Sequence, residues 1–312
     1  MNILNTPVLF LVFNRPGSAQ KVFEAIRYAR PKQLFIAADG PRAGKAGEKE
    51  ICAATRAIAT GVDWDCEVRT LFRDENLGCG PAVSSAISWF FDHVKSGIIL
   101  EDDCLPNRSF FLFCEAMLKK FEKDEHVMHI SGNNFQFSNI GNECYYRTKL
   151  PHIWGWATWK RAWKNYDFRL SGFNEDSRSV FFDHAAIDNY WHFCFTDTKK
   201  RLHTWDYQWV NAVFRKNGFC IAPQYNLVSN IGYTEEGTHI TDSSDYLSNL
   251  KSYEMPVPEA PGDCDYIMAA DINEQVFFNW MIEEDMEPNV SMRQILKITG
   301  SKILHKLRRP ST

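Results

Sequence analysis

The first hundred residues alternate short strand-like runs with amphipathic segments, and this alternation restricts the fold more than any other feature of the sequence. The strand-like runs, which are four to seven residues long, are 7–13, 33–38, 67–72 and 97–100, and all but 67–72 are mostly apolar. The segments between them, which carry apolar residues at helical spacing, are 18–30, 48–60 and 81–94. Strands that alternate with helices predict an α/β fold with a mostly parallel, doubly wound sheet flanked by helices.

The alternation becomes irregular after about residue 125. Residues 127–131 and 153–159 predict strands, and residues 206–216 predict a helix with its apolar side inward. Residues 241–265 are rich in Ser, Asp, Pro and Glu, which is typical of a loose connector.

We therefore expect one main domain over residues 1–240, followed by an irregular C-terminal extension over 241–312. The change in pattern divides the domain into two halves, about 1–125 and about 126–240. The extension ends in an amphipathic, basic segment, Ser291–Arg309. Such a segment is either an ordinary solvated helix or a weak anchor on an anionic membrane face.

The net charge and the cysteine pattern limit which partners and which cellular compartment we expect. A net charge of -4 and a pI near 6.2 disfavour nucleic acid as a partner. The nine cysteines show no C-x-x-C pair, which indicates reduced thiols in the cytoplasm. No signal peptide or membrane span is recognisable. We expect a cytoplasmic protein whose basic C-terminal segment is the place for peripheral contact with the inner membrane face.

Three adjacent carboxylates, Glu101, Asp102 and Asp103, directly follow the apolar run 97–100. Adjacent negative charges repel one another unless a cation is bound. Mg²⁺ or Mn²⁺ would satisfy them, and Mg²⁺ commonly takes one or two protein carboxylates together with phosphate oxygens. The triplet therefore predicts a metal and diphosphate site, although a solvated acidic turn has the same sequence.

Polar residues also follow the first two strands. Arg15 could contact a phosphate, or it could be a surface arginine in a turn. Asp39 could accept hydrogen bonds from a base or ribose, or it could belong to an ordinary Asp-Gly turn. In doubly wound sheets both positions lie at the edge where ligands bind.

The turn over residues 76–81 contains two glycines and opens the third helix. Asn76 and Gly78 could lie against a ligand at the helix N-terminus, or they could form only a tight turn. Neither a Walker A lysine nor a complete G-x-G-x-x-G is present, which argues against an ATPase and a dinucleotide dehydrogenase.

Asp206 stands between aromatic residues, with Trp205 before it, at the start of a predicted helix. It is either a helix cap or a general base, and the sequence leaves both open. His239 follows in a predicted loop, where it could reach a metal or a phosphate or be merely solvated.

In this order the motifs resemble the N-acetylglucosaminyltransferase I type of inverting GT-A glycosyltransferase and related bacterial sugar transferases, over roughly residues 7–240. The motifs are Asn14-Arg15-Pro16, Asp39-Gly40, Leu100-Glu101-Asp102-Asp103, Trp154-Gly155-Trp156, Trp205-Asp206 and a late glycine-containing stretch that ends at His239. Residues 132–150 and 241–312 match nothing in this pattern, which leaves donor sugar and acceptor open.

The resemblance implies a role for each matching position. Residues 1–240 would be a GT-A catalytic domain, with about 1–125 as its nucleotide-binding half and about 126–240 as its acceptor half. Arg15 would approach the donor phosphates and Asp39 the base, and Glu101 and Asp102 would face the sugar and ribose. Asp103 would bind the Mn²⁺ or Mg²⁺ ion and Asp206 would be the general base, while His239 is the second metal ligand that we expect from its place in the loop. The expected donor-binding set is Arg15, Asp39, Asn76, Gly78, Glu101, Asp102 and Trp205. The implied enzyme is a hexosyl- or N-acetylhexosaminyltransferase of polysaccharide synthesis.

The expected reaction moves a sugar, with inversion, from a nucleotide-diphosphate donor, UDP-linked for preference, to a hydroxyl of a glycan or lipid-linked glycan. Two alternatives remain. A sugar-1-phosphate nucleotidyltransferase is expected to carry a glycine-rich loop with a lysine after the first strand, and residues 14–17 are short and lack the lysine. A non-catalytic module that binds a nucleotide or a glycan would use the same fold.

Overall fold

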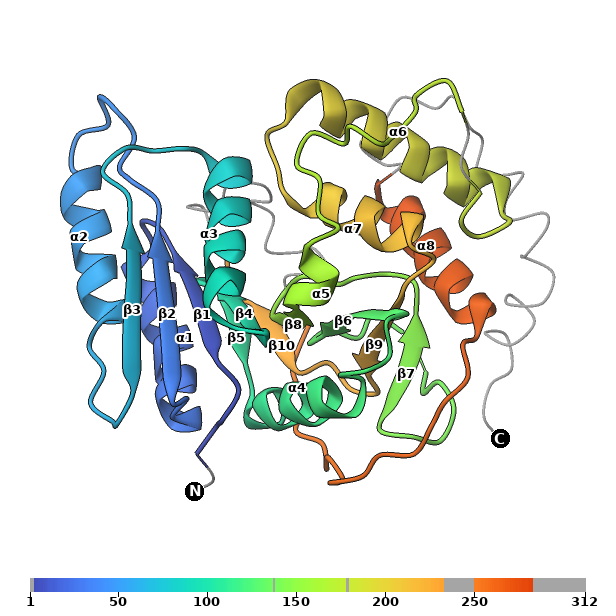
Figure 1. Cartoon of the computed structure of the whole chain (residues 1–312), viewed down its shortest axis with the longest axis horizontal. Helices are drawn as coiled ribbons and strands as arrows, with labels where there is room; N and C mark the ends of the chain where they lie inside the picture. Colours follow the sequence, from blue (N-terminus) through green and yellow to red (C-terminus); the bar gives the residue numbers. More distant parts are fainter. Residues whose placement is uncertain (1–2, 137, 178–179, 233–249, 283–312) are drawn as a thin grey trace, which may run out of the picture.

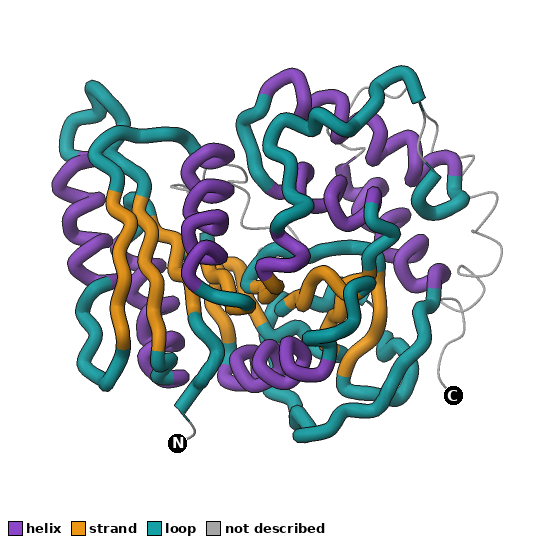
Figure 2. Tube along the Cα trace, in the orientation of Figure 1, coloured by secondary structure: helices purple, strands orange, loops and turns teal. Residues whose placement is uncertain are grey.

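The computed structural model describes residues 3–136, 138–177, 180–232 and 250–282, and its course is shown in Figures 1 and 2. A central eight-stranded sheet has the order β3-β2-β1-β4-β8-β6-β9-β7. Helices flank this sheet, so the predicted α/β fold class is confirmed.

The first half of the sheet is parallel. It contains β1 (Val8–Val12), β2 (Gln33–Ala38), β3 (Glu67–Phe72) and β4 (Ser96–Glu101). The helices between these strands are α1 (Pro16–Ala29), α2 (Glu48–Ala59) and α3 (Cys79–His93). Because β1 pairs with β2 on one side and β4 on the other, the strand order reverses at β1.

The second half of the sheet mixes directions. Its strands are β6 (Val127–Ser131), β7 (Tyr145–Thr148), β8 (Trp156–Trp159) and β9 (Phe219–Pro223). Strand β8 runs antiparallel to both β4 and β6, whereas β6 and β9 are parallel. A separate two-stranded sheet pairs β5 (Cys104–Pro106) with β10 (Val228–Asn230).

Five further helices complete the described chain. They are α4 (Arg108–Lys120), α5 (Lys160–Trp163), α6 (Ala185–Arg201), α7 (Asp206–Arg215) and α8 (Met268–Ile282). Figure 1 shows α6, α7 and α8 grouped beside the second half of the sheet.

Strand β1 is buried on both faces, as its unbroken apolar sequence predicts. Val8, Phe10 and Val12 belong to the apolar core that contains the buried face of α1. Leu9 and Leu11 belong to the core under α3 and the aromatic helices of the second half. Strand β1 carries no polar side chain. The first polar residues after it therefore lie just past its carboxyl end.

Residues 250–282 differ from the expected loose connector where the structure describes them. Glu254 accepts hydrogen bonds from the N–H groups of Arg108 and Ser109, at 3.0 and 2.9 Å, at the N-terminus of α4. Asp271 of α8 accepts from the Thr148 hydroxyl at 2.6 Å. These residues are therefore fixed to both halves of the domain, at α4 and at β7, whereas the predicted connector residues 241–249 and the basic segment 291–309 lie outside the described residues.

Candidate functional site

A cavity of about 300 Å³ opens at the carboxyl ends of β1, β2 and β4. Leu11, Ala37 and Ala86 contribute apolar lining from β1, β2 and α3. In open α/β sheets this is where ligands bind, outside the strand ends at the point where the strand order reverses. The cavity therefore fits the position that the sequence predicts for the site.

The described donor-side residues largely converge there. The cavity is lined by Arg15, Asp39, Asn76, Gly78, Glu101 and Asp102, all from the predicted set. Trp205 is the exception. It is 2% exposed, and its ring stacks on that of Trp156 at 5.7 Å and 16° within the core. The expected donor contact by Trp205 is therefore not supported, because core packing occupies the ring.

The carboxylates after β4 form a crowded negative cluster. Burial, together with the charges of Asp103 and Asp102, raises the pKa of Glu101 well above its usual range. Burial and Asp103 raise the pKa of Asp102 to about 7. The N–H of Phe13 donates to Asp102 Oδ2 at 3.0 Å, so the loop after β1 is joined to this cluster.

Arg15 is the cation at the cluster. One guanidinium nitrogen lies 2.6 Å from Asp103 Oδ2 and 3.6 Å from Asp102 Oδ1. Burial acts to lower the pKa of Arg15, but the charges of Asp102 and Asp103 outweigh it, so its pKa is raised. The guanidinium stays charged and faces the acidic end of the cavity.

The described residues do not by themselves form a metal site. Over the ranges that the structure describes, no three His, Cys, Asp or Glu side chains are grouped so that they could hold a metal ion. Asp103 offers carboxylate oxygens, Oδ1 accepting a thiol contact from Cys104 at 3.5 Å. Hard cations accept one such ligand when phosphate oxygens and water supply the rest. His239, the second expected ligand, lies outside the described residues.

Asp39 organises the glycine-containing turn before α3. Its carboxylate accepts hydrogen bonds from the N–H groups of Gly40, Leu77 and Gly78 at 2.9, 3.0 and 3.1 Å. The Asn76 amide also donates to it, at 3.0 Å. Asp39 thus holds in place the turn that forms one wall of the cavity. A contact between Asp39 and a nucleobase stays a prediction.

Helix α3 begins close to the segment that carries Asp206. A Cβ atom on Gly80 would lie 2.8 Å from the Thr204 carbonyl oxygen, a distance that real Cβ atoms do not adopt. Glycine at this position therefore allows the α3 N-terminus to touch the residues just before α7. The contact joins the two halves of the chain beside the cavity.

Asp206 is the first residue of α7. In the described part of the chain its hydrogen bonds end on Oδ1, which accepts from the Thr204 hydroxyl and from the Tyr207 N–H at 2.9 Å. The charge of Asp206 contributes to the raised pKa values of Glu101 and Cys79, so the carboxylate lies within electrostatic range of the cavity. This geometry accommodates both a helix-start role and a base role.

Sequence reasoning missed a buried anchor, Glu48, beside the cavity. Glu48 is 2% exposed, accepts from the Arg42 N–H at 2.6 Å and its Nε at 3.0 Å, and also accepts from Asn14 at 3.0 Å. The hydrogen bonds from Arg42 lower the pKa of Glu48 to about 2 despite its burial. Arg42 and Asn14 both line the cavity. In the sequence, an acid at a helix start is an ordinary feature, so nothing distinguished this one.

Comparison with known proteins does not assign the chain to a family. No family profile and no curated protein sequence matches the chain. Two solved structures of UDP-glucose pyrophosphorylase, one apo and one complexed with UDP-glucose, align at 10% identity with TM-scores of 0.35 and 0.36. They cover 70% of this chain, and 93% and 90% of theirs.

The structure of HddC from Yersinia pseudotuberculosis also aligns, at 10% identity and a TM-score of 0.30, over 58% of this chain and 85% of that one. These TM-scores are too low to decide between the GT-A type and its alternatives. Among the described helices, none has the length and apolar character needed to cross a membrane. The cytoplasmic location stays a prediction.

Proposed function

We propose that the protein is a glycosyltransferase that binds a nucleotide-diphosphate sugar, UDP-linked for preference, and transfers the sugar to a hydroxyl of a glycan or lipid-linked glycan. The observation that supports this is the single cavity at the strand switch, which is bordered by Arg15 and the carboxylate cluster and lies within electrostatic range of Asp206.

The cavity offers complementary groups for such a donor. Apolar side chains from β1, β2 and α3 suit a planar base, while Arg42 and Arg73 line the side near the ends of β2 and β3. Arg15 holds positive charge at the opposite, acidic end, where it pairs with a diphosphate. A divalent cation held by Asp103 and the diphosphate would supply further neutralisation of the leaving group.

Asp206 acts as the base in this proposal. Its Oδ1 is held by Thr204 and by the backbone of α7, which fixes the orientation of the carboxylate. Oδ2 then receives the proton of the acceptor hydroxyl as that oxygen attacks the anomeric carbon. One displacement on the face opposite the diphosphate inverts the anomeric configuration, as it does in inverting glycosidases.

The second candidate is sugar-1-phosphate nucleotidyl transfer, the activity named for the two UDP-glucose pyrophosphorylase structures. It uses the same kind of nucleotide-sugar site, so the cavity accommodates it equally. Against it, β1 ends at Val12 and α1 begins at Pro16, which leaves a three-residue loop, 13–15, without a lysine. A binding module without catalysis remains the third candidate.

One assay distinguishes the three. The protein is incubated with UDP-glucose, UDP-N-acetylglucosamine, UDP-galactose or a GDP-sugar, with Mn²⁺ or with excess chelator, and release of nucleoside diphosphate is measured as the sugar passes to water or to an added neutral oligosaccharide. Release that requires the metal supports glycosyl transfer. Formation of UTP from UDP-sugar and pyrophosphate supports nucleotidyl transfer instead. Thermal stabilisation by a nucleotide sugar without turnover in either assay supports the binding module.

A further inference from the structure

A second cavity, of about 560 Å³, lies on the acceptor half, beside the chain that connects β9 to β10. Its lining is mostly uncharged and polar. Five amide side chains contribute, and Lys251 is the single charged residue in the lining. Because charge is nearly absent, the cavity does not suit a phosphate-rich or polyanionic ligand.

Two exposed tyrosines line this cavity. Tyr225 is 46% exposed and Tyr253 is 56% exposed. Tyrosine presents a broad, rigid ring together with a hydroxyl, and it loses little conformational entropy when it binds. Such rings pack on the apolar face of a sugar, while neighbouring hydroxyls and amides form hydrogen bonds to its edge.

The frame that carries the tyrosines is rigid. Asn226 donates from Nδ2 to the carbonyl oxygens of Val228 and Lys251, at 2.8 and 3.1 Å. The backbone carbonyl oxygen of Asn226 accepts from the Tyr253 N–H at 2.8 Å. Asn226 thus ties the backbone beside Tyr225 to the backbone beside Tyr253, which limits how far the two segments can move apart before a ligand arrives.

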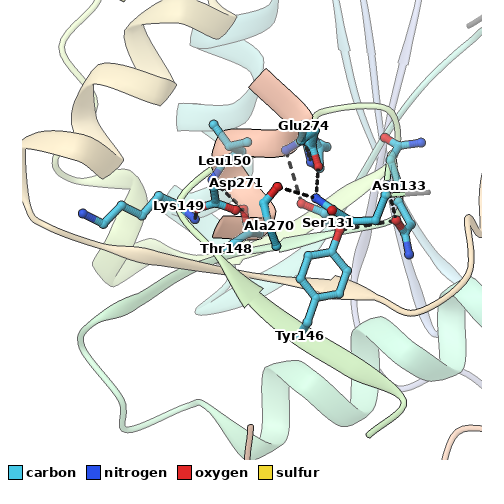
Figure 3. Close-up of polar contacts among 12 residues, drawn as sticks. Ser131, Asn133, Tyr146, Thr148, Lys149, Leu150, Ala270, Asp271 and Glu274 are labelled. Atoms are coloured by element: carbon cyan, nitrogen blue, oxygen red, sulfur yellow. Dashed lines mark hydrogen bonds and ion pairs between the residues drawn. The ribbon is translucent and has the colours of Figure 1, made fainter. Parts of the chain in front are cut away.

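A buried polar network holds Gln136, one of the residues that line the cavity. Gln136, which lines the cavity, donates to Glu274 of α8 at 2.6 Å, and Glu274 lies 3.0 Å from His152. Figure 3 shows Asp271 of α8 turned toward Thr148 at the end of β7, to which it is hydrogen-bonded. Helix α8 therefore supports the cavity from behind.

The cavity is connected to the donor site by a short stretch of chain. Five residue steps separate Asn226 from Ile231, which is roughly 17 Å at full extension. The N–H of Ile231 donates to the carbonyl oxygen of Asp103 at 2.8 Å. A ligand of several sugar units could occupy the cavity with one end directed to the donor site.

We propose that this second cavity binds a neutral oligosaccharide of hexose or N-acetylhexosamine units, which it holds as the acceptor. The binding step is independent of the donor site, whereas the acceptor role rests on the proposed glycosyl transfer. The acceptor is thus a polymer whose internal units are recognised on the tyrosines while its end is extended.

The test uses the full-length protein without nucleotide and neutral tetrasaccharides as probes: cellotetraose, maltotetraose and chitotetraose. Saturation-transfer difference NMR is expected to detect binding of at least one probe, and a sulfated oligosaccharide of equal length is expected to give no transfer. The double variant Tyr225→Ala/Tyr253→Ala should weaken binding at least tenfold, and Tyr225→Phe/Tyr253→Phe should retain it because the ring faces remain.

Phe193→Ala is the matched control, since Phe193 is also an exposed aromatic residue, at 55%, but lies on α6 outside this cavity. Melting temperatures of all variants are compared, to exclude misfolding. Absence of transfer to all three neutral probes at 10 mM overturns the proposal, as does undiminished binding in the folded alanine double variant. The binding test contains no nucleotide. Its result therefore stands even if the protein fails to turn over a nucleotide sugar.

Discussion

Asp206 carries the sharpest test at the scale of single residues. Asn keeps the size of the side chain and an oxygen for the contacts to Thr204 and Tyr207, but it takes up no proton at neutral pH. Asp206→Asn should leave the melting temperature and UDP-sugar affinity near wild type while turnover falls roughly a hundredfold or more. Turnover within a few-fold of wild type would assign the base elsewhere.

Asp39 is expected to affect stability as well as the donor, because its carboxylate accepts hydrogen bonds from the turn over residues 76–78. Asp39→Ala should lower the free energy of unfolding by about 1–3 kcal/mol, since the amides lose their acceptor, and should weaken donor binding with it. Denaturant unfolding and a UDP-sugar titration measure the two effects. Asp74→Ala, an exposed acid of the next strand end, is the control. Weakened binding with wild-type stability would show that the turn does not depend on Asp39.

Glu48 predicts a pH dependence of stability. Its pKa is about 2 in the folded protein against an ordinary value of 4.5, so its contribution is present above about pH 4.5 and is lost as the pH falls toward 2. The stability difference between wild type and Glu48→Gln should therefore shrink over that range. Unfolding measured at pH 7, 4 and 3 tests it, with the exposed Glu50→Gln on the same helix as control. A difference that stays constant with pH contradicts this role.

Gly80 provides the test at the scale of elements, where α3 meets the segment before α7. A Cβ atom there would lie 2.8 Å from the Thr204 oxygen and 3.1 Å from the Phe168 ring. Gly80→Ala should separate the helix start from Asp206, cost about 1–3 kcal/mol of stability and lower turnover at least tenfold. Gly17→Ala, in α1 with no atom near its Cβ position, should be neutral or stabilising. Equal turnover in the two variants would show that this contact does not position Asp206.

The elements show what local pattern can and cannot predict. Strands 33–38, 67–72 and 127–131 agree with the sequence prediction residue by residue, because each reflects its own side chains. Helix α6 was not predicted, since its aromatic residues surround the helix rather than form one stripe. The place of β8 between β4 and β6 depends on pairing across long stretches of chain, which local periodicity does not encode.

The candidate site also has features that local sequence predicts and features that it does not. The polar residues at the strand ends predicted which residues line the cavity. The roles of these side chains depend on partners that are distant in sequence. Asp39 meets the turn at residues 76–78, and Trp205 meets Trp156 in the core. Composition shows that aromatic rings are abundant but not which of them are buried.

At the scale of the whole molecule, α8 covers the end of the sheet at β7. Asp271 accepts from the Thr148 hydroxyl at 2.6 Å in a buried contact and from the Lys149 N–H at 2.8 Å in a partly buried one. Asp271→Ala should cost about 1–3 kcal/mol, because these donors lose their partner, and should speed amide hydrogen exchange in α8 and β7 more than in β1 and β2. The exposed Asp265→Ala is the control. Uniform acceleration over the entire sheet would show that α8 is not a separable unit.

The parallel stack of Trp156 and Trp205 also gives the molecule an optical marker. Two indoles 5.7 Å apart at 16° and shielded from water couple electronically, so their near-ultraviolet circular dichroism depends on the spacing and angle of the rings. Trp205 precedes Asp206 in the chain. Because Trp156 also contacts Trp163 and Trp209, the near-ultraviolet spectrum is that of the whole tryptophan cluster, and it reports, without any label, whether a variant that has lost turnover keeps the packing next to Asp206.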